Sequence, residues 1–154
     1  AKTNMEFQLD LDSIERNISN KTKIVIINSP NNPTGVVYSQ KSLDDLSQLL
    51  LLKEKYYGHP IFIVADDIYR HLIFDGLSNS NVFLSYTNSV LVNSHSKDLG
   101  LAGERIGYIA VHPDAVGREE INQALITCNR ILGFVNAPAM MQKILPLIGN
   151  VEVL

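Results

Sequence analysis

The sequence predicts one α/β domain, a three-layer sandwich in which a mostly parallel sheet with one antiparallel strand has helices on both faces. Three short apolar runs, 23–28 (KIVIIN), 61–65 (IFIVA) and 89–93 (SVLVN), have the β-branched composition of strands buried in a parallel sheet. A long helical stretch separates the first two runs, as a parallel crossover requires. The chain has 154 residues, which is the size of a single domain.

The helices are predicted from apolar spacing and from the residues that punctuate it. Residues 10–19 place Leu11, Ile14 and Ile18 on one helical face. Residues 39–57 place leucines at helical spacing, and Gly58 then ends the helix. Two further helices are predicted at 113–132 and 137–149, whereas 70–87 is predicted to be loop with short strand pieces.

A fourth strand is predicted at 105–111 (RIGYIAV). The linker before it is about eleven residues long and contains two glycines, so it is too short for a helical crossover. This linker predicts an antiparallel return and should form a polar loop that carries Lys97.

Composition excludes several classes of protein. The net charge is −3 without a basic run, so a nucleic-acid or anionic membrane surface is not indicated. No segment approaches 18 uninterrupted apolar residues, and the first ten residues lack the apolar core of a signal peptide, so we expect a cytoplasmic enzyme. Cys128 is the single cysteine; we expect a buried, inert thiol and no disulfide or metal site.

Polar residues follow three of the predicted strands. Asn28 leads to the turn-rich segment 29–35 (SPNNPTG), Asp66 follows the second strand, and Asn93-Ser94 leads to Lys97. In open α/β sheets ligands bind beyond the carboxyl ends of the strands. If these strands are parallel neighbours, an amide, a carboxylate and an amine converge there, although each alone could be an ordinary loop residue.

Taken together, three segments resemble the motifs of class I/II aminotransferases, which are fold-type I pyridoxal-phosphate (PLP) enzymes. The segment 29–35 resembles their Asn-Pro-Thr-Gly loop, and 66–69 (DDIY) resembles their Asp-x-x-Tyr element. The segments 94–97 (SHSK) and 100–108 (GLAGERIGY) resemble their lysine signature. The resemblance runs from about residue 9 to about residue 140 and implies a mostly parallel sheet with one antiparallel strand.

The resemblance implies which residues contact three parts of PLP: the carbon that forms the Schiff base, the ring nitrogen and the phenolic oxygen. Lys97 would form a Schiff base with PLP and, once released, would carry a proton as general acid/base. Asp66 would pair with the ring nitrogen and favour its protonated form. Asn32 and Tyr69 would donate hydrogen bonds to the phenolic oxygen. Asp67, beside Asp66, has no such match and is expected to be structural.

The resemblance also implies the residues that hold the phosphate. Arg105 and Ser94 match the family's phosphate arginine and serine, and the planar guanidinium suits bidentate phosphate binding. Ser96 would assist them. His95 lies between the two serines and is expected to be a spacer. His59, His71 and His112 are expected to lie on the surface.

Several family elements are not found in the sequence, including a Gly-rich phosphate loop, an aromatic residue that stacks on PLP, and the C-terminal small domain. Residues 1–154 are therefore expected to be part of the PLP-binding large domain, and the fragment is expected to be inactive alone. The expected function is amino transfer between an amino acid and a 2-oxo acid, in a homodimer.

The alternatives are a PLP-dependent carbon–sulfur β-lyase, a non-catalytic effector-binding domain of a transcription regulator, and a degenerate fragment. Tyr69 and the run 103–105 (GER) favour transamination over β-lysis.

Overall fold

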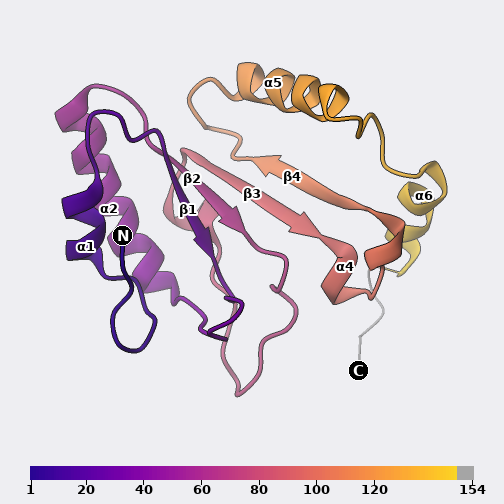
Figure 1. The fold of residues 1–154 in the computed structure, drawn as a ribbon, viewed down its shortest axis with the longest axis horizontal. Helices are drawn as coiled ribbons and strands as arrows, with labels where there is room; N and C mark the ends of the chain where they lie inside the picture. Colours follow the sequence, from indigo (N-terminus) through magenta and orange to yellow (C-terminus); the bar gives the residue numbers. More distant parts are fainter. Residues whose placement is uncertain (149–154) are drawn as a thin grey trace.

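The structure, a computed structural model, describes residues 1–148 and has a four-stranded mixed sheet at its centre (Figure 1). The strands are β1 (Ile24–Asn28), β2 (Phe62–Asp66), β3 (Ser89–Ser94) and β4 (Gly107–Val111), in the spatial order β1-β2-β3-β4. The pairs β1–β2 and β2–β3 are parallel, and β3–β4 is antiparallel. The predicted α/β class, the mostly parallel sheet and the single antiparallel strand are confirmed.

The four predicted helices occur in the predicted order with differences at their ends, and two short helices that were not predicted lie between them. They are α1 (Leu11–Asn17), α2 (Gln40–Tyr57), α3 (Val82–Ser85), α4 (His95–Asp98), α5 (Arg118–Ile131) and α6 (Ala139–Ile148), with a 3₁₀ turn at Ala102–Glu104. Ser39 caps the start of α2 by accepting a hydrogen bond from the Ser42 amide, and Gly58 ends the helix in the left-handed conformation, with φ 73°. In the described residues no helix is long and apolar enough to cross a membrane.

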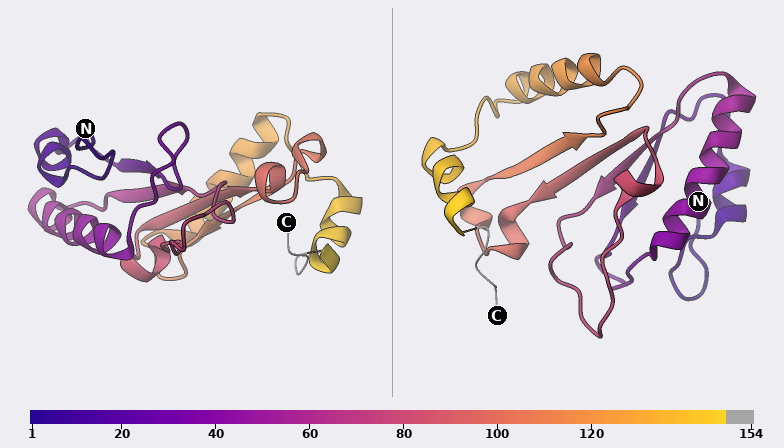
Figure 2. Two further views of the ribbon diagram at one scale, coloured as in Figure 1. Left: turned by 90° about the horizontal axis from the view of Figure 1, so that it is seen from below. Right: turned by 180° about the vertical axis from the view of Figure 1, so that it is seen from behind.

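The hydrophobic core lies between one face of the sheet and the first three helices. Leu46 and Leu50 of α2 and Ile63 of β2 are fully buried, and Ile14 of α1 and Val82 of α3 join the same cluster. Figure 2 shows α1 and α2 lying together at the β1 side of the sheet. This layer fixes β1 and β2, whose carboxyl ends form part of the candidate site.

The opposite face of the sheet is covered unequally. Apolar side chains of all four strands and of α5 line an open groove of about 420 Å³, among them Phe62, Val64, Val92 and Leu125. Ile26 on this face of β1 is 73% exposed. Helices thus lie on both sides of the sheet, as predicted, but α5 leaves much of the second face open to solvent.

Four local predictions were wrong or incomplete. Residues 70–87 contain the helix α3 and no strand, because Asn81 caps a helical turn by accepting from the Phe83 amide. Lys97 lies on the helical turn α4 and not in a loop. The Cys128 thiol is exposed and not buried, because α5 buries none of its residues in this chain. The fifth helix begins at residue 118 and not at 113, and residue 149 of the last predicted helix lies outside the described residues.

Candidate active site

The carboxyl ends of the three parallel strands meet at one edge of the sheet, as the sequence predicts. Asn28 is paired in register with Asp66, and Asp66 is paired with Val92, two residues before Ser94. The Asn28 side-chain amide donates to the backbone carbonyl of Asp66 at 3.0 Å. This contact ties the ends of β1 and β2 together and fixes the starting points of the loops that follow them.

The Asp66 carboxylate has an oxygen that no group in the described residues satisfies. Alternation along β2 places Asp66 on the same face as Phe62 and Val64, which is the open face of the sheet. Its Oδ1 is buried and has no hydrogen-bond partner within residues 1–148. A buried carboxylate oxygen left unpaired is costly. This atom can accept a hydrogen bond from a donor that residues 1–148 do not supply.

The loop after β1 brings Asn32 to Tyr69. Asn28 Oδ1 accepts from the Asn31 side chain at 3.1 Å and from the Asn32 amide at 3.2 Å, so the strand end holds the loop. Gly35 closes the turn with a left-handed φ of 71°, which favours glycine. The Asn32 side-chain amide then donates to the Tyr69 hydroxyl at 3.2 Å. Two polar side chains from separate loops therefore lie together beside the Asp66 strand end.

Lys97 lies on the single turn α4, directly after β3. Ser94 is the N-cap of this turn, and its hydroxyl accepts from the Ser96 amide at 3.2 Å and lies 2.8 Å from the Ser96 hydroxyl. The Lys97 side chain is exposed. The turn thus presents an accessible amine next to two hydroxyl groups.

Arg105 lies beside this turn but does not contact Ser94 or Lys97 in the described residues. Ser94 is paired with Gly107, and the His95 amide donates to the Ile106 carbonyl at 3.1 Å, so the chain before β4 runs next to α4. A Cβ on Gly107 would meet the Asn93 carbonyl oxygen at 2.3 Å, so only glycine allows this approach. The exposed Arg105 guanidinium donates to the Ala102 carbonyl at 2.9 Å. An arginine and two serine hydroxyls therefore lie at the two ends of the segment 94–105, and these are suitable donors for a phosphate group.

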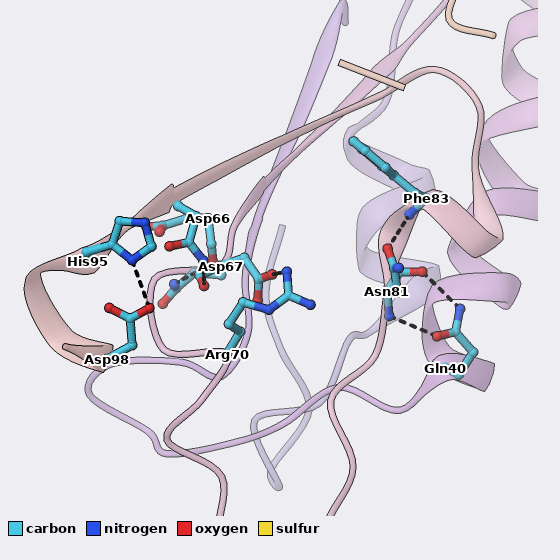
Figure 3. Close-up of polar contacts among 10 residues, drawn as sticks. Gln40, Asp66, Asp67, Arg70, Asn81, Phe83, His95 and Asp98 are labelled. Carbon is cyan, nitrogen blue, oxygen red and sulfur yellow. Dashed lines mark hydrogen bonds and ion pairs between the residues drawn. The ribbon is translucent and has the colours of Figure 1, made fainter. Parts of the chain in front are cut away.

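Asp67 is buried and structural in character, unlike its neighbour Asp66. Its carboxylate lies 3.0 Å from the Arg70 guanidinium (Figure 3). Its backbone carbonyl accepts from the Asn93 side chain at 3.0 Å. Burial raises the pKa of the Asp67 carboxyl, and the positive charge of Arg70 opposes this rise. The contacts hold the turn between Asp66 and Tyr69 against β3.

Asp98 is the residue near the site that sequence reasoning missed. Its carboxylate is 3.2 Å from the His95 ring, so His95 has a partner and is more than a spacer (Figure 3). The spacing of three residues between His95 and Asp98 on a helix was the available signal. In a loop, which the sequence predicts for 94–104, the same spacing does not bring two side chains together. Of the remaining histidines, His71 is exposed as expected, whereas His59 and His112 are partly buried.

Comparisons with known proteins agree on one family. The sequence profile described as aminotransferase class I and II matches residues 2–145. A probable aspartate/prephenate aminotransferase of Thermus aquaticus is 39% identical over 110 residues, which are 71% of this chain and 27% of that protein. An asparagine–oxo-acid transaminase of Streptococcus mutans is 29% identical over 148 residues, which are 94% of this chain and 35% of that protein.

Solved structures give the same result. The crystal structure of an amino transferase from Eubacterium rectale superposes with a TM-score of 0.89 at 44% identity, over 92% of this chain and 36% of that chain. A double mutant of Thermus thermophilus aspartate aminotransferase gives a TM-score of 0.70 at 28% identity, over 86% and 31%. The chain therefore spans about a quarter to a third of the length of the proteins it matches.

Proposed function

Because this chain belongs to the class I and II aminotransferase family, we propose that the protein containing it uses PLP to transfer an amino group between an amino acid and a 2-oxo acid. The observation that carries this proposal is the buried, unpaired Oδ1 of Asp66 at the carboxyl edge of the sheet. The Asn32–Tyr69 pair beside it supports the same proposal. Together they offer one acceptor for a ring N–H and two donors for a ring oxygen.

The residues present fit PLP, whose ring absorbs the electron pair left when a bond to the substrate Cα breaks. Asp66 would accept the hydrogen of the ring nitrogen and favour its charged form. Asn32 Nδ2 and the Tyr69 hydroxyl would donate to the phenolic oxygen. Ser94 and Arg105 would hold the phosphate, with Ser96 assisting. Rotation of the Arg105 guanidinium away from the Ala102 carbonyl would free its donors for that contact.

Lys97 would serve first as tether and then as proton carrier. Its amine must lose a proton before it can attack a carbonyl carbon. Once substrate has displaced it, the free Nζ would take the proton from the substrate Cα and deliver it to the C4′ carbon of the cofactor. The exposure of Lys97 on a short turn gives the amine the freedom that two roles require.

The proposal concerns the protein that contains this chain, since the relatives are about three times as long. Residues 1–154 would form part of its PLP-binding large domain. We also propose that this protein is a homodimer and is located in the cytoplasm. The open apolar groove supports a larger assembly, because exposed apolar areas of this kind mark contact surfaces.

Two other functions remain distinguishable by experiment. A carbon–sulfur β-lyase would release a thiol, ammonia and a 2-oxo acid from a cysteine conjugate, with no 2-oxo acid acceptor. A non-catalytic effector-binding domain would bind PLP without turnover. Tyr69 favours transamination, because the β-lyases that this chain resembles often carry histidine at that position.

The test compares Lys97→Ala with Lys143→Ala in the protein that contains this chain. Both changes remove an exposed lysine, but Lys143 lies on α6. Activity is assayed with aspartate, alanine or an aromatic amino acid plus 2-oxoglutarate. We expect Lys97→Ala to abolish turnover and Lys143→Ala to leave it unchanged. Full activity of Lys97→Ala would exclude the proposed mechanism.

A further inference from the structure

The turn that carries Lys97 is too short to be stable by itself. The helix α4 contains four residues, His95–Asp98. Nucleating one helical turn fixes several backbone dihedrals for about one hydrogen bond, so isolated turns are unstable. Contacts from outside the turn must therefore set the position of the lysine.

Backbone contacts attach the turn at its two ends. The His95 amide donates to the Ile106 carbonyl at 3.1 Å, and the Leu101 amide donates to the His95 carbonyl at 3.0 Å. These bonds fix the two ends of the segment 95–101. They do not hold the last residue of the turn, Asp98, which follows Lys97 directly.

A side-chain pair holds that last residue. His95 Nδ1 lies 3.2 Å from Asp98 Oδ2, and the Asp98 side chain is only 8% exposed. Asp98 Oδ1 accepts from the Leu99 amide at 2.8 Å, so both carboxylate oxygens have partners. A carboxylate only accepts, so Nδ1 of His95 must carry the hydrogen. Among the described residues, His95 is the one side chain that pairs with Asp98.

The pair also attaches the turn to β4. The His95 ring lies 6.0 Å from the Tyr108 ring, centroid to centroid, and Tyr108 lies in β4. The Asp98 side chain is thus buried and the His95 side chain partly buried, while Lys97, which lies between them in sequence, is exposed. Removing His95 would leave Asp98 Oδ2 without its partner on a side chain that is only 8% exposed, and an unpaired buried carboxylate oxygen costs far more than the loss of a surface ion pair.

We propose that Asp98 and His95 are positioning residues that fix the α4 turn and so aim the Lys97 amine at the atoms it reacts with. This inference rests on the proposed function of Lys97. The pair would act through the lysine and would touch neither cofactor nor substrate.

The first test needs no activity and uses the protein that contains this chain. Hydrogen exchange is measured by mass spectrometry for the wild type, Asp98→Ala, His95→Phe and the double variant. His95→Phe keeps a ring beside Tyr108 but has no Nδ1–H. Asp45→Ala is the matched control, because it also removes an aspartate from an ion pair within a helix, at Lys41 on α2.

We expect each single variant to raise amide exchange in 95–101 by about tenfold or more, and to leave 40–57 unchanged. The double variant should exchange no faster than the single variants, since both remove the same contact. Unchanged exchange in 95–101, or additive effects in the double variant, would overturn the proposal. If Asp98→Ala fails to fold, His95→Phe decides the question in the same way.

The second test separates positioning from general stability. In the protein that contains this chain, Asp98→Ala should lower kcat about 10²-fold, the effect of misplacing a reacting group by about 1 Å, with little change in KM. In a Lys97→Ala background assayed with added methylamine, which supplies a free amine, Asp98→Ala should cause no further loss. An equal loss in both backgrounds would overturn the proposal. Full activity of Lys97→Ala alone would instead refute the proposed function of Lys97. Hydrogen exchange would then still test whether His95 and Asp98 fix the α4 turn.

Discussion

Glu54 of α2 joins the end of that helix to the starts of β2 and β3. Its Oε1 accepts from the Ile61 amide at 2.7 Å, from the Tyr86 hydroxyl at 2.8 Å and from the Asn88 side chain at 2.8 Å. Ile61 is fully buried, and Tyr86 and Asn88 are nearly so. We therefore expect Glu54→Ala to be one of the most destabilising polar substitutions in the described chain.

The size of this effect follows from the donors that would be left without a partner. The Tyr86 hydroxyl also contacts the Ile61 carbonyl at 2.7 Å, so it keeps an acceptor. The Ile61 amide and the Asn88 side chain lose theirs. Each buried donor left unsatisfied costs roughly 1–3 kcal/mol, so Glu54→Ala should lower the free energy of unfolding by about 3 kcal/mol.

Urea unfolding followed by circular dichroism measures this change. With a slope of about 2 kcal/mol per M, a loss of about 3 kcal/mol lowers the midpoint by about 1.5 M. Glu54→Gln is the matched control, since its carbonyl oxygen can still accept, and it should cost only about 1 kcal/mol. Equal midpoints for Glu54→Ala and the wild type would show that these contacts do not stabilise the sheet.

Three further predictions concern the cofactor, alkaline pH and the chain by itself. In the protein that contains this chain, Asp66→Asn should still bind PLP, which its absorbance would show. Its kcat should fall by about 10³-fold or more, equivalent to about 4 kcal/mol of barrier. A normal kcat would refute the pairing of Asp66 with the ring nitrogen. Burial and the Glu54 hydrogen bond raise the pKa of Tyr86 above 10.0, so its contribution to stability is complete below that pH and is lost as pH rises further. Urea midpoints of Tyr86→Phe should therefore fall less steeply above pH 10 than those of the wild type, and parallel curves would contradict this. Finally, residues 1–154 alone, titrated with PLP and assayed with an amino acid and 2-oxoglutarate, should show weak binding and no transamination; stoichiometric binding with turnover would refute this expectation.

The strands and the long helix could be predicted because local sequence and packing agree there. The runs 23–28, 61–65 and 89–93 are apolar and β-branched, and a parallel sheet with a covered face suits that composition. The antiparallel strand followed from the length of its linker. The meeting of Asn28 and Asp66 at one edge then followed from parallel pairing alone.

Other features depended on contacts that a sequence does not display. Asn81 caps α3, and Gln40 at the start of α2 accepts from the Asn81 amide at 2.9 Å (Figure 3). That partner is 41 residues away in sequence, so local propensity could not predict the turn. The His95–Asp98 pair was hidden because its helix contains only four residues. The exposure of Cys128 depends on which residues pack over α5, and the sequence of that helix does not predict them.

The most direct test of the account is to identify the lysine that holds PLP. The protein that contains this chain is loaded with PLP and reduced with borohydride, and its peptides are mapped by mass spectrometry, with Lys97→Ala as the control. We predict a single pyridoxyl label on Lys97 in the wild type and none on any lysine of the variant. A label on Lys53, Lys143 or another lysine, with Lys97 unmodified, would contradict the account.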